Sequence, residues 1–256
     1  MAHEFRIPLH MTADEYKIAE LFVVARVAET STQRVRILKN EPFDNTIGQL
    51  GDVSAISNCA IPRAKGQYTL KHYFVSDDLP FFLRPLFPKE GFLLIEEAWN
   101  AFPRSFTAMT SNVFRKEKFF ISCESVYVDG HMVADNAFLL PPVELAARTV
   151  EVLHIEARDT AVDDMDPSTY VCGKTGRGPL AAGWVTSATP IMTCYKLLRV
   201  KFDYLGLEKK MQQFIAERHR GIFMTSARQA QCTSHEWHGL TLDDIRTLEA
   251  KHAVAS

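Results

Sequence analysis

The chain has few cysteines, no long hydrophobic run and no marked excess of charge of either sign. Its five cysteines are odd in number and far apart, which argues against a disulfide framework and against zinc spacing, so we expect reduced thiols. The uncharged stretch 178–195 carries two prolines and several polar residues, and is therefore no membrane span. The 29 basic and 31 acidic residues give a net charge of about −2. Neither this balance nor the spacing suits a nucleic-acid partner.

What the chain does contain is typical of a globular protein. Of its 256 residues, 46% are hydrophobic and 23% are charged, which sets aside disordered and fibrous architectures. No repeat or linker divides it, so we expect one domain over residues 1–256. The N-terminus shows no basic segment followed by an apolar run, and an intracellular, cytoplasmic location is therefore expected.

Local patterns predict both strands and helices. Thr12 and Glu15 have the spacing of a capping box, and a helix is expected from there to about residue 28 with an apolar side of Tyr16, Ala19, Val23 and Val27. A short strand precedes it, and further strands are predicted at 34–39, 67–75, 92–95, 105–112, 117–128, 149–158 and 193–203. The short connections favour an extended, largely antiparallel sheet.

The last third changes to helical spacing. Residues 206–232 predict a long helix that uses Leu207, Met211, Phe214, Ile215, Ile222 and Phe223, with Gly221 as a weak point. A final helix is predicted to begin after Thr241, its N-cap, with Leu242, Ile245 and Leu248 as the apolar stripe.

Two motifs suggest enzymatic sites and then fail. The sequence GKTGRGP (173–179) evokes a phosphate loop, but Ser168 stands where the pattern needs glycine and no strand precedes it. A nucleotide-dependent enzyme that uses Lys174 is thus a weak hypothesis. In SHEWHG (234–239), His235 and His238 are three apart, whereas a zincin helix needs four. No nucleophile elbow or catalytic cysteine signature appears.

Two further segments leave alternatives open. In KGQYTLKHYF (65–74), alternation puts Thr69 and Lys71 on one face of a strand, opposite Tyr68 and Leu70; that face is either solvated or part of an enclosed polar site. The segment 76–91 combines large apolar groups with three prolines. It is either a loop folded over the core or a lid that opens onto an apolar phase.

Taken in order, EYKIAELFVVA, NEPFDN, KGQYTLKHYF, LPFFLRPLFPKEG, EEAWNAFPRSFT, GKTGRGPL, CYKLLRVKF and LTLDDIRTLE resemble the class I phosphatidylinositol transfer proteins, from about residue 4 to 250. The resemblance implies an α+β, START-like helix-grip fold, in which a large curved, mostly antiparallel sheet and long helices enclose a single phospholipid cavity. It implies exchange of phosphatidylinositol and phosphatidylcholine between membranes, without catalysis, metal or cofactor. The implied partners are the phospholipid cargo and a transiently contacted membrane surface, for a monomer that binds no nucleic acid.

The resemblance also implies roles for individual residues. The set implied for the inositol ring is Thr69, Lys71, Glu96, Asn100 and Glu249. The set implied for the phosphate region is Lys196, Thr107, Ser125 and Glu20. The set implied for membrane docking and the lipid-exchange loop is Phe81, Phe82, Leu86, Phe87, Tyr204 and Leu205.

Several positions depart from the family pattern. Tyr204 and Leu205 replace a pair of docking tryptophans, which weakens docking or shifts it to other residues. Glu20 replaces a glutamine, and a carboxylate there repels a phosphodiester unless it is protonated or paired. Cys172 replaces a serine that is phosphorylated in some members, and Ser105 replaces an alkylatable cysteine. The departure at Tyr204 and Leu205 favours an alternative function, that of a lipid sensor or presenter with weak transfer activity and phosphatidic acid as ligand.

Overall fold

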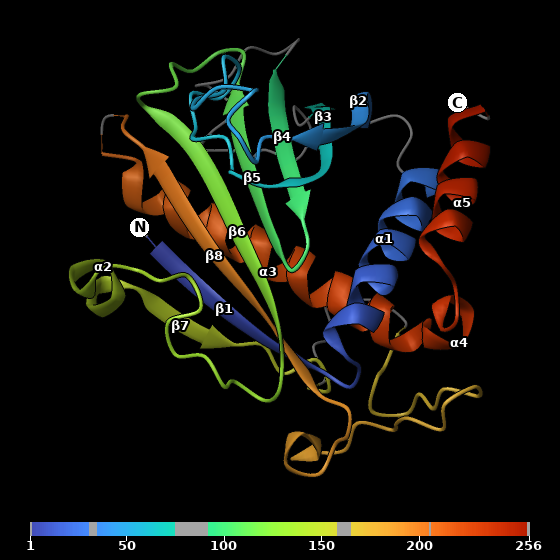
Figure 1. The fold of residues 1–256 in the computed structure, drawn as a ribbon. Helices are drawn as coiled ribbons and strands as arrows, with labels where there is room; N and C mark the ends of the chain where they lie inside the picture. The colour runs from blue at the N-terminus through green and yellow to red at the C-terminus, as the bar shows by residue number, and fades with distance from the viewer. Residues whose placement is uncertain (1, 31–34, 75–91, 158–164, 205, 255–256) are drawn as a thin grey trace. The chain divides into compact units, whose positions relative to one another are not determined.

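The computed structural model describes residues 2–30, 35–74, 92–157, 165–204 and 206–254 (Figure 1). These residues form an α+β protein with one eight-stranded sheet of order β2-β3-β4-β5-β6-β8-β1-β7. The strands are β1 Ala2–Leu9, β2 Val35–Asp44, β3 Lys65–Phe74, β4 Leu93–Ala101, β5 Arg104–Ser111, β6 Phe119–Asp129, β7 Thr149–Val152 and β8 Met192–Phe202. The helices are α1 Ala13–Thr30, α2 Pro142–Ala147, η3 Trp184–Thr186, α3 Glu208–Cys232, α4 Ser234–Trp237 and α5 Leu242–Val254.

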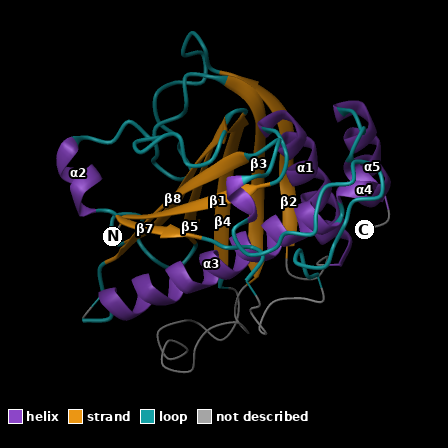
Figure 2. Cartoon of the chain, turned by 90° about the horizontal axis from the view of Figure 1, so that it is seen from below, coloured by secondary structure: helices purple, strands orange, loops and turns teal. Residues whose placement is uncertain are grey.

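The sheet is mostly antiparallel. Strands β2 to β5 pair antiparallel in succession, whereas β1 and β7 pair parallel. Figure 2 shows these strands together with the helices coloured by type. The predicted fold class is confirmed in these terms, because a mostly antiparallel sheet accompanied by long helices is consistent with a START-like protein.

Contacts divide the chain into two compact units. The first comprises Met1–Ala2, Ser31–Ser125 and Leu197–Ile215, and the second comprises His3–Thr30, Val126–Lys196 and Ala216–Ser256. Strands β6 and β8 contribute residues to both units. The single domain expected from the sequence stays a prediction.

The first unit has its core on one face of β3, β4 and β5. Phe43, Cys59, Trp99 and Ala108 are buried there, and Tyr68 packs against them. Part of the segment between β2 and β3 lies on the same face, since Cys59 belongs to it. Burial of these apolar groups stabilises this unit.

Two strands of this unit are longer than predicted. Strand β2 continues to Asp44 and β4 to Ala101, beyond the predicted ends at 39 and 95. Pro42 lies inside β2 without breaking the sheet, because β2 is an edge strand in the sheet order and proline is tolerated there. In the second unit, β7 ends at Val152 rather than at 158.

The helix starts of the second unit follow their capping signals. The Thr12 amide donates to Glu15 Oε2 at 2.8 Å and the Glu15 amide donates to Thr12 Oγ1 at 3.1 Å, so the predicted capping box is confirmed. Tyr16, Ala19 and Val23 are buried as expected. At α5, the Asp244 amide donates to Thr241 Oγ1 at 3.2 Å. Helices α1 and α5 pack together (Figure 1).

Helix α3 runs unbroken through Gly221 over 25 residues. Met211, Ile215 and Phe223 are buried, but Ile222 is 54% exposed, so its assignment to the apolar stripe is wrong. One position before Phe223 lies about 100° around the helix axis, outside the stripe. Leu242, which is 39% exposed at the first position of α5, is a similar correction. None of the described helices is both long and apolar enough to cross a membrane.

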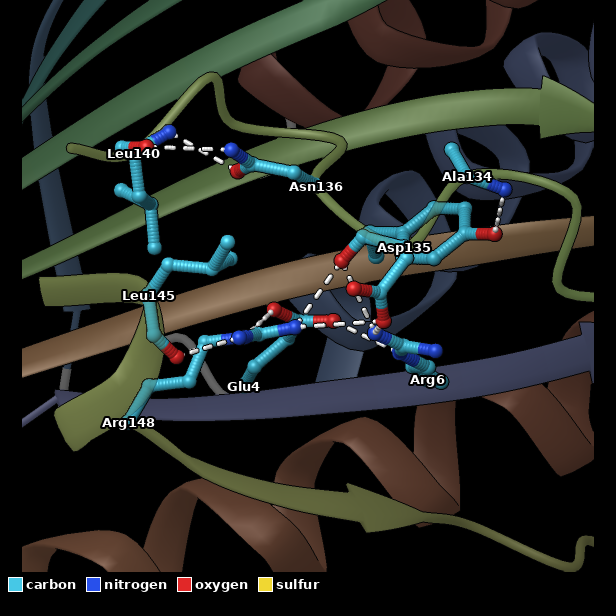
Figure 3. Close-up of polar contacts among 9 residues, drawn as sticks. Glu4, Arg6, Ala134, Asp135, Asn136, Leu140, Leu145 and Arg148 are labelled. Carbon is cyan, nitrogen blue, oxygen red and sulfur yellow. Dashed lines mark hydrogen bonds and ion pairs between the residues drawn. The ribbon is translucent and has the colours of Figure 1, made fainter. Parts of the chain in front are cut away.

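A buried ionic network holds the 130–148 region of the second unit on β1 (Figure 3). Glu4 is fully buried, and its two carboxylate oxygens lie 2.6 Å from Arg6 Nε and Arg148 Nε. Both guanidinium groups also donate to the backbone carbonyl of Asp135, at 3.0 and 2.9 Å. Pairing of this kind offsets the cost of burying a carboxylate.

Candidate functional site

The strand register of the first unit places five predicted residues on one face. Thr69 pairs with Ala98, and Lys71 pairs with Glu96. Since side chains alternate along a strand, Asn100 shares that face with Glu96. Across the next strand pair, Ala98 lies opposite Thr107. The face therefore carries Thr69, Lys71, Glu96, Asn100 and Thr107.

This face lies opposite the cluster of Phe43, Cys59, Trp99 and Ala108. The core residues Trp99 and Ala108 point to the other side, together with Tyr68. On that side the Tyr68 hydroxyl donates to Glu97 Oε1 at 2.8 Å, and Ser54 donates to both Glu97 oxygens. Glu97 and its partners on the core face are thus satisfied within the unit, whereas the buried Ser57 hydroxyl next to them has no partner among the described residues.

The Thr69 hydroxyl differs from the hydroxyls of Tyr68 and Ser54, which both bond Glu97. Its oxygen is inaccessible to solvent and has no hydrogen-bond partner among the described residues. The residue beside it on β4 is Ala98, which is itself buried and lies opposite Thr107 on β5. A buried hydroxyl without a partner costs about 1–3 kcal/mol. A ligand that offers a hydrogen bond at this point recovers that cost.

Lys71 and Glu96 form the charged part of the face. Lys71 Nζ lies 3.4 Å from Glu96 Oε1, and their side chains are only 19% and 9% exposed. Tyr73, two residues after Lys71, hydrogen-bonds to the same carboxylate; burial and the negative charge of Glu96 raise the pKa of Tyr73 well above its ordinary value. A cation, an anion and a hydroxyl that stays protonated together offer donors and acceptors for a polyol.

A second polar cluster lies in the other unit, around Lys196 on β8. Lys196 Nζ is 3.6 Å from Glu20 Oε1, and the ring centroids of Tyr127 and Phe223 lie 5.7 and 5.2 Å from the ammonium. The Tyr127 hydroxyl donates to both oxygens of Glu20, at 3.0 and 2.9 Å. Glu20 is therefore paired. Pairing is one of the two conditions, protonation being the other, under which a carboxylate here would not simply repel a phosphodiester.

The surroundings of Lys196 keep its ammonium group charged. Burial opposes the charge of Lys196, yet the neighbouring Cys194, Tyr127, Tyr16 and Glu20 raise its pKa well above the ordinary value, so that the ammonium stays charged. For Tyr16, burial and the Glu20 carboxylate both raise the pKa well above its ordinary value. The cluster thus presents a fixed cation among aromatic rings.

Other predicted residues are placed singly. Ser125 is buried on β6. Glu249 on α5 accepts a hydrogen bond from Arg246 at 2.6 Å; it belongs to the second unit, and its predicted convergence with Thr69 and Lys71 stays a prediction. Tyr204 packs on Phe114 in the first unit, with ring centroids 4.8 Å apart. The remaining docking residues, Phe81, Phe82, Leu86, Phe87 and Leu205, lie outside the described residues.

The GKTGRGP motif makes structural contacts in the second unit. Lys174 Nζ donates to the His238 carbonyl at 2.9 Å, and Arg177 Nη1 lies 2.7 Å from Glu15 Oε2 at the start of α1. The described residues 165–172 before the motif form no strand, and the short 3₁₀ segment η3 that follows is not the helix that a phosphate loop requires. These contacts account for Lys174 and Arg177 without a nucleotide.

Cysteine and metal predictions can be compared directly. All five cysteines are free thiols, as the sequence predicts. Cys172, which directly precedes the motif, is buried. Within the described ranges, His, Cys, Asp and Glu side chains form no group suited to a metal ion.

The residues that sequence reasoning missed are aromatic. Strand alternation in the sequence puts Tyr73 on the face of Thr69 and Lys71, but no role was predicted for it there. Tyr127 and Phe223 could not be found in this way, because they meet Lys196 from β6 and α3 only through tertiary structure.

Comparison with known proteins gives consistent matches over nearly the whole chain. A family model described as phosphatidylinositol transfer protein matches residues 1–253. Phosphatidylinositol transfer protein 2 of Dictyostelium discoideum is 34% identical over 259 residues, covering 96% of this chain and 91% of that protein. Cytoplasmic phosphatidylinositol transfer protein 1 of Drosophila melanogaster is 32% identical over 253 residues, covering 96% and 86%.

A third relative is much longer. Protein retinal degeneration B of Drosophila melanogaster is 35% identical over 276 residues, which cover 98% of this chain but 20% of that protein. The chain therefore spans about a fifth of this relative's length.

Proposed function

The chain belongs to the phosphatidylinositol transfer protein family, and we propose on that premise that it binds one phosphatidylinositol or phosphatidylcholine molecule and exchanges it between membranes. The phospholipid is cargo in this proposal and is not altered. The polar residues described above therefore act as binding groups, and no catalytic residue is assigned.

The observation that carries the proposal is the unpartnered Thr69 hydroxyl on a face that also holds Lys71, Glu96 and Asn100. An inositol ring presents five hydroxyl groups, each of which both donates and accepts. Burying them costs about 1–3 kcal/mol for each one left without a partner. Thr69 and the Lys71–Glu96 pair supply such partners on adjacent strands, and Glu249 is proposed to complete the set.

The same argument separates the two cargoes. Choline has no hydroxyl group to pair with Thr69 or Glu96, so these residues favour phosphatidylinositol over phosphatidylcholine. The phosphate is common to both lipids. The residues proposed around it, Lys196 with Ser125 and Thr107, should therefore affect both lipids alike.

Lys196 is proposed as the main phosphate contact. A phosphodiester is costly to bury without a cation, and the Lys196 ammonium stays charged beside Tyr127 and Glu20. Glu20 must share this cation with the phosphate. We expect phosphate binding to be weaker than it would be with a neutral residue at position 20.

The acyl chains explain why such a protein must enclose its cargo. Each methylene exposed to water costs about 0.8 kcal/mol, so two chains of ordinary length cannot be carried through water uncovered. The proposed cycle is closed transport followed by opening at a membrane, to which the protein binds only peripherally. We propose a cytoplasmic monomer, in line with the name of its relative in Drosophila melanogaster.

The sensor alternative is less well supported. Phosphatidic acid carries up to two negative charges on its phosphate, and the Glu20 carboxylate 3.6 Å from Lys196 opposes such a ligand. Exchange of singly charged or zwitterionic phospholipids is therefore the function that the arrangement supports best.

The test combines lipid analysis with a transfer assay. Purified protein should carry one phospholipid per chain by native mass spectrometry and should move labelled phosphatidylinositol between vesicles. Recovery of lipid-free protein that moves no labelled phospholipid would overturn the proposal. Binding without measurable transfer would favour the sensor alternative instead.

A further inference from the structure

The hairpin turn between β5 and β6, residues 112–118, lies at one end of the first unit's sheet. Phe74, the last residue of β3, pairs with Leu93 at the start of β4. The Leu93 amide donates to Asn112 Oδ1 at 2.9 Å, which ties the turn to the same end. The end of β3, the start of β4 and the start of the turn therefore lie side by side.

The end of β8 reaches the same turn. The Asp203 amide donates to the Lys118 carbonyl at 2.7 Å. Phe114 from the turn packs on Phe202 and Tyr204, with centroid distances of 5.8 and 4.8 Å. The ends of β3, β5 and β8 thus lie at one end of the first unit's sheet.

This end combines exposed apolar groups with cations. Val113 is 41% exposed and Phe74 is 45% exposed. The Arg115 side chain is 81% exposed, and Lys118 Nζ lies over the Tyr204 ring at 5.2 Å. Residues 112–118 contain three basic residues and one acidic residue, so the turn is positive in a chain whose net charge is −2.

We propose that the turn 112–118 is a docking element for the surface of a bilayer that contains anionic phospholipids, with Arg115 and Lys118 contacting lipid head groups and Val113 and Tyr204 reaching the interface. Basic side chains near an anionic bilayer are attracted to it, and aromatic residues with a polar tip favour the interfacial region. This inference rests on the proposed function, because it names the membrane class and the surface through which exchange takes place.

The test compares two charge reversals of equal size within the first unit. One is the double variant Arg115→Glu/Lys118→Glu in the turn. The matched control is Lys65→Glu/Arg104→Glu, since Lys65 and Arg104 are exposed and begin β3 and β5 at the opposite end of the strands. Binding is measured by vesicle co-sedimentation, and transfer by movement of labelled phosphatidylcholine, with phosphatidylcholine vesicles that contain or lack phosphatidylserine.

The turn variant should lose at least about tenfold in binding and transfer on phosphatidylserine-containing vesicles at low salt, and should match the wild type on phosphatidylcholine alone. The control should retain wild-type behaviour on both, and added salt should weaken the wild type only on anionic vesicles. Equal loss in both variants, or no loss in the turn variant, overturns the docking proposal. Absence of transfer by the wild type on every vesicle overturns the proposed function instead. If the charge reversal fails to fold, the milder Arg115→Gln/Lys118→Gln variant repeats the test. Its binding and transfer on anionic vesicles should lie between those of the wild type and those expected for the reversal.

Discussion

Lys196 Nζ lies 3.6 Å from Glu20 Oε1, so the cation proposed for the lipid phosphate is already partly neutralised by a carboxylate of the same unit. A phosphodiester that enters this cluster adds a second anion next to Glu20. The pair therefore sets the strength of phosphate binding.

Glu20→Gln should increase the retention of both phosphatidylinositol and phosphatidylcholine, by roughly three- to tenfold, because it removes the like charge but keeps an acceptor for the Tyr127 hydroxyl. Lipid retention after dilution into acceptor vesicles measures the effect. Glu41→Gln, which changes an exposed partner of Lys39 in the first unit, is the control and should change nothing. Weaker retention by the Glu20→Gln variant would contradict this reading of the pair.

Lys196→Met should reduce loading with both lipids to a similar extent. Because the single change leaves Glu20 without its cation, it is best made together with Glu20→Gln, so that the lost stability of a broken pair is separated from lost phosphate binding. Lipid extraction and quantification of the two cargoes measure the result. A selective loss of only one lipid would show that Lys196 does not contact the shared phosphate.

Thr69→Val should leave the protein's stability unchanged or slightly higher, because the hydroxyl that it removes has no partner among the described residues. Ser54→Ala is the matched control: its hydroxyl bonds both oxygens of the buried Glu97. That change should lower the free energy of unfolding of lipid-free protein by about 1–3 kcal/mol. Thermal unfolding of the two variants provides the comparison, and equal destabilisation would argue that Thr69 has an internal partner.

Glu15→Gln should destabilise the protein at neutral pH and become neutral in acid. Burial opposes the Glu15 charge, but Arg177 and the Thr12 amide lower its pKa below the ordinary value. Its stabilisation is therefore complete above the unfolded-state pKa of about 4.3 and is lost as pH falls through the folded-state value. The cost at pH 7 should be about 1 kcal/mol, measured by urea unfolding across pH. A difference that persists at low pH would contradict the ionic origin.

Features that depend on residues close together in the sequence could be predicted correctly. The Thr12–Glu15 capping box and the shared face of Thr69 and Lys71 follow from spacing along the chain. Sequence reasoning failed where tertiary position decides. Strand β2 continues past its predicted end at residue 39, because its edge position tolerates Pro42, and Ile222 has helical spacing yet lies outside the buried side of α3.

The partners of Lys196 could not be predicted from spacing alone. Tyr127 and Phe223 come from elements that are far apart in sequence, and nothing in the local pattern of β8 points to them. The resemblance supplied Lys196 and Glu20 as candidates. The structure adds that the two side chains are paired, so Glu20 is expected to weaken phosphate binding by competing for Lys196 and not to prevent it.

The most direct test of the central claim is native mass spectrometry of wild-type protein and the Thr69→Val variant after incubation with vesicles that hold equal amounts of phosphatidylinositol and phosphatidylcholine. The wild type should carry one phospholipid per chain with phosphatidylinositol enriched, and Thr69→Val should shift the bound population toward phosphatidylcholine by about five- to a hundredfold. An unchanged ratio of the two lipids in Thr69→Val would contradict the inositol site on the face of β3 and β4.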